Sequence, residues 1–322
     1  MSLKINLCKD KNQWDSFVDL SPQGNIFCTT SYLDALGEDY DLVLVDENNQ
    51  VKMGAIIIKQ NGKPIKAPYP FTMYQGIFFD NAIYNMPKHR RVKKILTITE
   101  YLLAKLNDKY NRISFGLHYN VDDLRSFQWF NYHNPEKGQF KIALRYTGIL
   151  DLCTWKSFDQ YLLNIRTVRR QEYNKIKSSN FIIELSNDID TLDLLHNKTF
   201  ERQGIDRHNE EVRLLRSITH SALTKGYGQL LVCKNAEGIA ISAIVFLYDR
   251  RCGYYMFAAN DPEYRKTGCG TYLMLENIRQ CREKGLLKVD MVGINSPGRG
   301  DFKTSFNAVP VPYFIVNWEK PE

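Results

Sequence analysis

The organisation of this 322-residue chain can be traced outward from one short segment, Arg265-Lys266-Thr267-Gly268-Cys269-Gly270. A β-type apolar and aromatic run, 253–259, precedes it, and apolar residues at helical spacing follow in 271–281. Glycines let a backbone approach a ligand closely, and the free N–H groups of a helix start attract anions. Arg265 and Lys266 add two cations. The segment Arg265–Gly270 therefore predicts a binding site for a phosphate-bearing molecule.

The spacing of the glycines narrows the kind of ligand. The pattern is neither a P-loop nor the Gly-x-Gly-x-x-Gly dinucleotide fingerprint. Arg-x-x-Gly-x-Gly resembles instead the pyrophosphate loop of the GNAT superfamily of N-acetyltransferases. This resemblance implies acyl-CoA, acetyl-CoA above all, as a co-substrate. An ordinary strand-to-helix turn is the alternative reading of the same residues.

Bulk composition is that of a soluble globular protein large enough for two domains, with 43% hydrophobic and 25% charged residues. The formal net charge of +7 fits a phosphate-bearing ligand or a polyanionic partner. Much of the excess lies in 88–94 and 166–177. Either run could equally be a solvated helix face.

The seven cysteines are dispersed, without a Cys-x-x-Cys or a Cys/His cluster, so no metal site is indicated. Dispersed thiols favour a reducing compartment. The first residues lack the apolar segment of a signal peptide, and no apolar run approaches the roughly 18 residues of a membrane span. We therefore expect a cytoplasmic protein. The sequence does not indicate an oligomeric state.

The pattern of strands and helices divides the chain into two domains, 1–150 and 151–322. The second half predicts a basic helix over 158–178 and then strand, two helices, three strands, the helix after Gly270, and two strands at 288–292 and 312–318. That order is the GNAT order. The first half follows the same order more loosely, without a visible sequence repeat.

A second resemblance covers nearly the whole chain. The segment 292–306, with Phe302-Lys303 at its centre, resembles the Phe-Lys-x-x-Phe/Trp region of Fem-type aminoacyltransferases, and 24–33 and 125–129 resemble their first domain. The resemblance implies an α/β (α+β) protein of two tandem GNAT-like domains, each a mixed, mostly antiparallel sheet flanked by helices. It also implies that Lys303 contacts the donor or assists at the reacting centre.

Acyl transfer to an amine needs a base, stabilisation of the carbonyl oxygen and a proton for the leaving group. Asp290, on the strand after the loop helix, is the predicted base, with Glu201 and Asp206 as alternatives. Tyr272 is a candidate proton donor to a thiolate. The predicted catalytic residues are thus Asp290, Lys303 and Tyr272.

Three functions follow. The first is an N-acyltransferase that moves an acyl group, acetyl in the simplest case, from acyl-CoA to an amine of a small molecule or cell-envelope precursor. The second is a Fem-type transferase that uses aminoacyl-tRNA, for which the basic run 166–177 would supply phosphate contacts. The third is a GNAT-fold protein that binds a ligand without turnover.

Overall fold

The computed structural model describes residues 2–321 and divides them into two compact units. The first unit is formed by residues up to 145 together with those from 312 on, and the second by 146–311. The sequence had assigned 312–318 to the second domain. In the structure this strand packs within the first unit, because its apolar side chains belong to that core.

The first unit is built on an antiparallel sheet in the order β1-β2-β3-β4, with β5 also paired to β3. The strands β6 and β13 pair antiparallel and belong to a second, eight-stranded sheet. The elements are β1 (Leu3–Leu7), α1 (Lys11–Leu20), α2 (Thr30–Leu36), β2 (Asp39–Glu47), β3 (Gln50–Gln60), β4 (Lys63–Pro64), β5 (Ile77–Phe79), α3 (Asn81–Tyr84), α4 (Lys88–Lys109), β6 (Arg112–Gly116), α5 (Arg125–Gln128) and β13 (Val309–Glu319). The strand β7 (Lys141–Asp151) leads from the first unit into the second.

The core of the first unit explains why its central strand reads as a continuous apolar run. Side chains alternate between the two faces of a strand, so a strand covered on both faces is apolar at every position. In β2 the residues 42–45 are all buried. Val43 and Val45 share a core with Leu102 and Leu106 of α4, and this helix therefore covers one face of the sheet.

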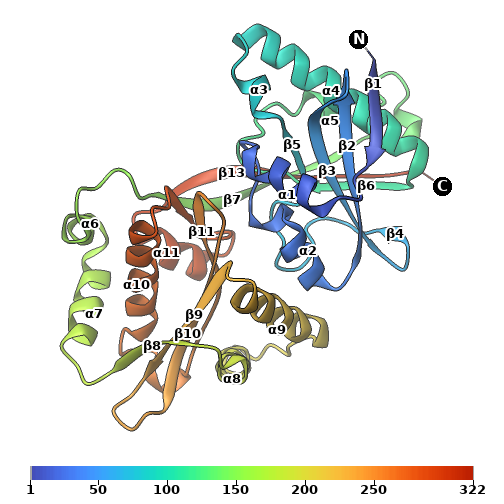
Figure 1. The fold of residues 1–322 in the computed structure, drawn as a ribbon. Coiled ribbons are helices and arrows are strands. Elements are labelled where there is room, and N and C mark those ends of the chain that lie inside the picture. Colours follow the sequence, from blue (N-terminus) through green and yellow to red (C-terminus); the bar gives the residue numbers. More distant parts are fainter. Residues whose placement is uncertain (1, 322) are drawn as a thin grey trace. The chain divides into compact units, whose positions relative to one another are not determined.

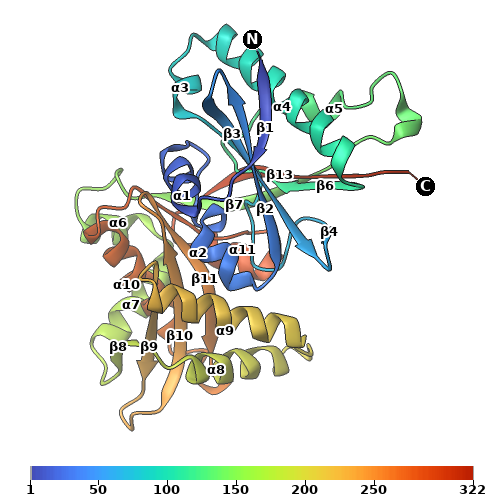
Figure 2. The same ribbon diagram turned by 45° about the vertical axis from the view of Figure 1, so that its right-hand side comes forward.

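The second unit has an antiparallel sheet, β8-β9-β10-β11, extended by β12, which runs parallel to β11. Helices α8 and α9 cover one face of it, and α10, with α7 against it, covers the other (Figures 1 and 2). The elements are α6 (Phe158–Asn164), α7 (Thr167–Lys177), β8 (Ile182–Ser186), α8 (Ile189–Glu201), α9 (Asn209–Thr224), β9 (Gly228–Lys234), β10 (Ala240–Tyr248), β11 (Cys252–Asn260), α10 (Cys269–Glu283), β12 (Lys288–Asp290) and α11 (Pro297–Thr304). The predicted fold class, mixed sheets flanked by helices, is confirmed.

Two local predictions differ from the structure. The helix expected over 158–178 is two helices, because the backbone at Ile165 is extended while its side chain is buried. The strand expected to reach Val292 ends at Asp290, and Val292 has a left-handed φ of 51° that a strand cannot contain. The helix α11 was not expected, since glycines at 298 and 300 lower helix propensity.

Candidate active site

The strands β11 and β12 separate in the second unit. They pair in parallel from Cys252–Lys288 to Tyr254–Asp290, after which β12 ends while β11 continues to Asn260. At the same level Met256 bulges out of the register between Tyr255 and Phe257. A bulge bends a strand and re-aims the neighbouring backbone and side chains. The two strands therefore diverge beside a distorted stretch of β11.

The side chain of Lys303 lies where the strands diverge. Its Nζ donates to the carbonyl oxygens of Val292, at 3.1 Å, and Gly293, at 2.9 Å, in the turn after β12. On the other side it lies 5.0 Å from the ring centroid of Tyr255 on β11. Burial lowers the pKa of Lys303 to about 8, with Asp290 opposing the shift and Arg299 adding to it. This amine therefore gives up its proton far more readily than an ordinary lysine.

Asp290, the last residue of β12, forms hydrogen bonds that hold the turn after this strand. Its fully buried carboxylate accepts from the hydroxyl of Thr147 and, at 2.8 Å, from the N–H of Val292. These bonds hold the left-handed turn whose carbonyls receive Lys303. The structure thus brings Asp290 and Lys303 together, the first as a buried acceptor and the second as a half-buried amine.

The predicted phosphate loop is covered by α7. A Cβ added at Gly268, which has a φ of 98°, would lie 2.8 Å from Cβ of Glu172, and one at Gly270 would lie 2.9 Å from Oδ1 of Asn260. The Glu172 carboxylate accepts from Oγ1 of Thr271 at 2.5 Å, in the first turn of α10. Both glycines therefore have a packing reason to be glycine. A carboxylate already lies where a helix start attracts anions.

The other loop residues differ in exposure. Arg265 and Lys266 are exposed, and among residues 2–321 neither has a hydrogen bond or ion pair through its side chain. Cys269 is buried, and the hydroxyl of Thr267 donates to its Sγ at 3.0 Å. The two cations are thus the loop side chains most available to a ligand.

Tyr272 belongs to the contact between α10 and α7. Its ring stacks on that of Tyr173, with centroids 4.8 Å apart. The Tyr173 hydroxyl in turn donates to Glu276 at 2.8 Å. Burial raises the pKa of Tyr272. The structure therefore groups Tyr272 with α7 and not with Lys303.

Sequence reasoning missed Arg169 and Glu172, which link α7 to the predicted loop and to α11. Both lie within the run 166–177, whose charge was noticed. Their partners are about a hundred residues away, and no local pattern in the sequence marks such pairs. Among residues 2–321 no group of His, Cys, Asp or Glu is suited to a metal ion. Within the same residues, no helix is long and apolar enough to cross a membrane.

The second unit has the order β-α-α-β-β-β-α-β, with a bulged strand and a glycine-containing loop before the next helix, as the sequence predicted for a GNAT-like domain. Residues 164–304 match the family model of the acetyltransferase (GNAT) domain. The resemblance to the GNAT superfamily is therefore confirmed. No curated protein matches the sequence.

Solved structures extend the similarity over the whole chain. A structure of FemX has 15% sequence identity and a TM-score of 0.71, and the match covers 98% of this chain and 97% of FemX. A conserved protein of unknown function from Bacteroides thetaiotaomicron has 13% identity and a TM-score of 0.60, covering 98% and 100%. A tandem GNAT protein from the clavulanic acid biosynthesis pathway has 11% identity and a TM-score of 0.55, covering 100% of each chain. At such identities the likeness establishes a shared fold.

Proposed function

We propose that the second unit transfers an acyl group to an amine at the divergence of β11 and β12. The attacking amine adds to the acyl carbonyl carbon and negative charge develops on the carbonyl oxygen. The bond from the acyl carbon to the oxygen or sulfur of the donor then breaks, and the proton lost by the amine goes to that leaving atom. The protonated amine of Lys303 is the cation that stabilises this oxygen. Asp290 helps to keep Lys303 charged, because the negative carboxylate opposes the effect of burial.

We propose an aminoacyl-tRNA as the donor, and one observation carries this choice. The Glu172 carboxylate receives the Thr271 hydroxyl at the start of α10, where a CoA pyrophosphate would have to lie. Arg169 also pairs with this carboxylate at 2.7 Å, so a pyrophosphate at the helix start would have to displace Glu172 from both of these donors. A donor held by its 3′ ester, with its phosphates bound elsewhere, avoids this conflict. Arg170, Lys175 and Lys177 on α7 would contribute to binding such a polyanion.

Acyl-CoA is the second candidate donor, with Arg265–Gly270 as its pyrophosphate loop. The two exposed cations, Arg265 and Lys266, favour it, as does the matched family model of the acetyltransferase domain. In this version Glu172 must move before the donor binds, and Tyr272 would give the thiolate its proton.

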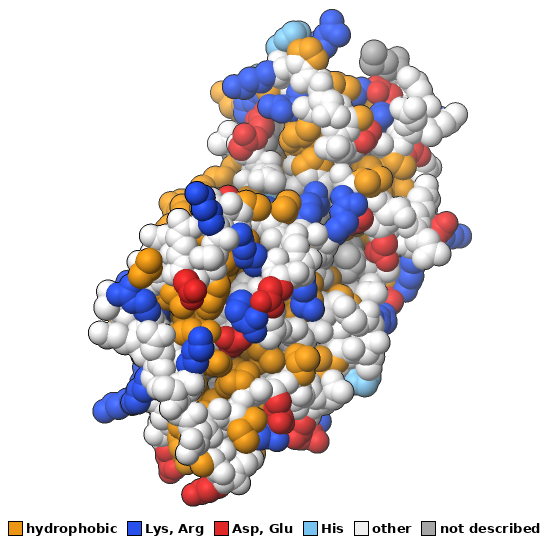
Figure 3. Space-filling model, turned by 60° about the vertical axis from the view of Figure 1, so that its left-hand side comes forward, with side chains coloured by type: hydrophobic (Ala, Val, Ile, Leu, Met, Phe, Trp, Pro, Cys, Tyr) orange, Lys and Arg blue, Asp and Glu red, His pale blue; other side chains and the backbone are white. Residues whose placement is uncertain are grey.

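On the face that Figure 3 shows, the basic side chains are spread rather than gathered in one area. Figure 3 turns the α6–α7 side of the molecule forward, where blue side chains alternate with red and orange ones. Few phosphates would be neutralised at once on such a surface. We therefore expect tRNA affinity to fall with salt along a shallow slope, equivalent to about two to four phosphate contacts.

The acceptor in this proposal is an amine of a small molecule or of a cell-envelope precursor. We propose a cytoplasmic location, because tRNA is used there and because the cysteines at 8, 28, 153, 233, 252, 269 and 281 are all free thiols.

Donor binding tests the proposal directly. One titration uses tRNA whose 3′ amino acid is attached by an amide in place of the reactive ester. The other uses CoA. Each ligand is titrated into wild type and into Glu172→Gln. We expect saturable tRNA binding by both proteins, and CoA binding that is weak in wild type and about tenfold tighter in Glu172→Gln. Wild-type CoA binding as tight as that of the variant would overturn the choice of donor. Absence of binding of either donor would overturn the transferase proposal.

A further inference from the structure

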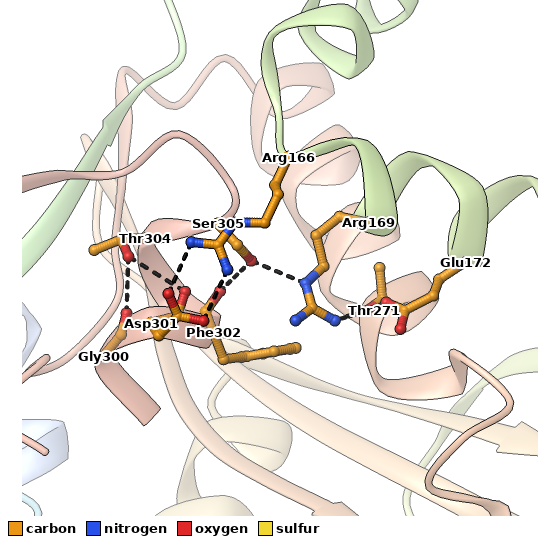
Figure 4. A network of polar contacts seen from close by, with 9 residues as sticks. All are labelled: Arg166, Arg169, Glu172, Thr271, Gly300, Asp301, Phe302, Thr304 and Ser305. Carbon is orange, nitrogen blue, oxygen red and sulfur yellow. Dashed lines mark hydrogen bonds and ion pairs between the residues drawn. The ribbon is translucent and has the colours of Figure 1, made fainter. Parts of the chain in front are cut away.

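Two arginines, Arg166 just before α7 and Arg169 within it, contact α11, the helix that carries Lys303 (Figure 4). Arg166 forms two bonds to the carboxylate of Asp301, of 2.7 and 2.8 Å, at an exposed position. Arg169 lies further in, and its side chain is 16% exposed against 47% for Arg166. The two arginine side chains thus contact α11 at one exposed and one mostly buried position, and the backbone N–H of Arg166 also donates to the carbonyl oxygen of Ser305 at 3.0 Å.

The buried contact reaches the residues on either side of Lys303. Nε of Arg169 donates to Oγ of Ser305 at 2.9 Å, and that hydroxyl donates to the carbonyl oxygen of Phe302 at 2.5 Å. The guanidinium also lies 4.7 Å from the ring centroid of Phe302 and 5.9 Å from that of Phe306. Cation–π contacts and hydrogen bonds therefore act together on this end of α11.

The opposite edge of the same guanidinium reaches α10. Its Nη1 donates to Oε2 of Glu172 at 2.7 Å and to Oγ1 of Thr271 at 3.2 Å. A planar fork with donors on several edges can serve both helices at once, which a lysine ammonium on a flexible stem cannot do. Arg169 is therefore the side chain that joins the start of α10 to the end of α11.

We propose that Arg169 is a positioning residue for Lys303: it holds α11 where the lysine Nζ reaches the carbonyl oxygens of Val292 and Gly293. The importance of this role rests on the proposed function, in which Lys303 acts at the reacting centre. The contact itself is a property of the fold and can be measured without turnover.

The protonation of Lys303 reports its position. Burial is the main cause of its low pKa, and the charged groups that act on it are Asp290 of β12 and Arg299 of its own helix. If α11 loosens, water reaches the amine and its pKa rises from about 8 toward the ordinary value of 10.5. Labelling with trace acetic anhydride across pH, read by mass spectrometry at Lys303, measures this pKa, because only the neutral amine reacts.

We expect Arg169→Ala to raise the pKa of Lys303 by about one unit, which slows its labelling at pH 8 by about fivefold. Arg169→Lys gives a similar shift, because charge without the fork cannot serve both helices. The matched control Arg166→Ala, which removes the exposed contact of the same two helices, leaves the value within about 0.3 units. In turnover, Arg169→Ala lowers kcat with little change in KM.

Thermal unfolding monitored by circular dichroism establishes that the variants are folded. If Arg169→Ala does not fold, Ser305→Ala removes the Nε acceptor alone and raises the pKa of Lys303 in the same direction by a smaller amount. An unchanged pKa in folded Arg169→Ala, or an equal shift in Arg166→Ala, would overturn the positioning role. A wild type that transfers no acyl group would overturn the proposed function and leave the labelling result intact.

Discussion

Both units contain a strand–helix–strand succession, but the space beside the strands is filled differently in each. In the first unit β5 precedes α4 and β6 follows it, as β11 precedes α10 and β12 follows it in the second. At β6 a Cβ on Gly116 would lie 2.1 Å from the carbonyl oxygen of Met73, and one on Gly76 would lie 2.6 Å from that of Gly116. Backbone therefore packs directly on backbone in the first unit. In the second, pairing of the corresponding strands stops at Asp290, and the Lys303 amine lies between the turn after β12 and the Tyr255 ring of β11.

The difference shows that the same succession of elements can be filled by packed backbone in one unit and can hold an ionisable side chain in the other. Glycines let backbone pack on backbone in this part of the first unit, where the nearby ionisable residue His118 is buried against Tyr74. The first unit has a left-handed residue of its own at Phe71, whereas the left-handed residue of the second unit, Val292, lies beside a half-buried amine, that of Lys303. Energetically unfavourable groups of this kind tend to cluster at functional sites. The comparison therefore points to the second unit as the site of chemistry.

The largest expected effect is on activity in the second unit. Lys303→Met should lower kcat for acyl transfer by about 10²–10³-fold, because one preorganised charge at a developing oxyanion has that weight. The control Lys225→Met, at the exposed end of α9, should leave kcat unchanged. Steady-state kinetics with both variants measures this. Equal activity of the two variants would remove Lys303 from the reacting centre.

The next effect concerns stability of the first unit. Gly116→Ala should lower the free energy of unfolding by about 3 kcal/mol, because backbone must shift to admit the new methyl group. At Gly298 an added Cβ meets nothing within 4 Å, so Gly298→Ala is the control and should change stability by less than about 1 kcal/mol. Urea unfolding compares them. A loss of unfolding free energy below about 1 kcal/mol for Gly116→Ala would mean that the backbone at Gly116 is not tightly packed against that of Met73.

The third effect is a pH dependence specific to the second unit. The folded pKa of Lys303, about 8, is below the ordinary 10.5, so burial of the charged amine destabilises the folded state below pH 8. This penalty disappears as pH rises from 8 to 10.5, where the unfolded chain binds the extra proton. Relative to Lys303→Met, wild type should gain about 2 kcal/mol across this range, less than the full shift implies because the side chain is only half-buried. Denaturant unfolding of both proteins at each pH measures this difference. An equal change in the free energy of unfolding of wild type and Lys303→Met between pH 8 and 10.5 would contradict the prediction.

The smallest effect concerns the helix starts. Glu172→Gln should lower stability by about 1 kcal/mol, because two hydrogen bonds, from Arg169 and Thr271, lose a charged acceptor. The start of α4 has a proline cap without a side-chain bond, so Lys88→Ala in its first turn should have almost no effect. Denaturant midpoints compare the pair. A larger loss of stability for Lys88→Ala than for Glu172→Gln would contradict a stabilising role of Glu172 at the start of α10.

Local patterns were sufficient to predict most elements of both units. The alternation and helical spacing around Arg265–Gly270 identified β11 and α10, and Asp290 was correctly placed on the following strand. The position of Lys303 came from a resemblance instead. Its helix, with Pro297, Gly298 and Gly300, lacks a helical signal of its own.

The contacts that give these residues their environment could not be predicted. Glu172 lies 99 positions before Thr271, and Thr147 lies 143 positions before Asp290. Such pairs depend on which elements become neighbours in the fold, and one sequence does not encode this in any local window. For the same reason the two loop glycines suggested a ligand, whereas in the structure each makes room for another part of the chain.

The pairing of β13 with β6 also has a consequence for the order of folding during synthesis. Val316 and Trp318 are buried in the core of the first unit, and Ile315 pairs with Gly116. A ribosome that has completed residues 1–145 has therefore not yet made one of that unit's strands. All of the second unit, 146–311, is synthesised in between. The part of the chain that is made first is the last to be complete, and until then one edge of β6 is open to other partners.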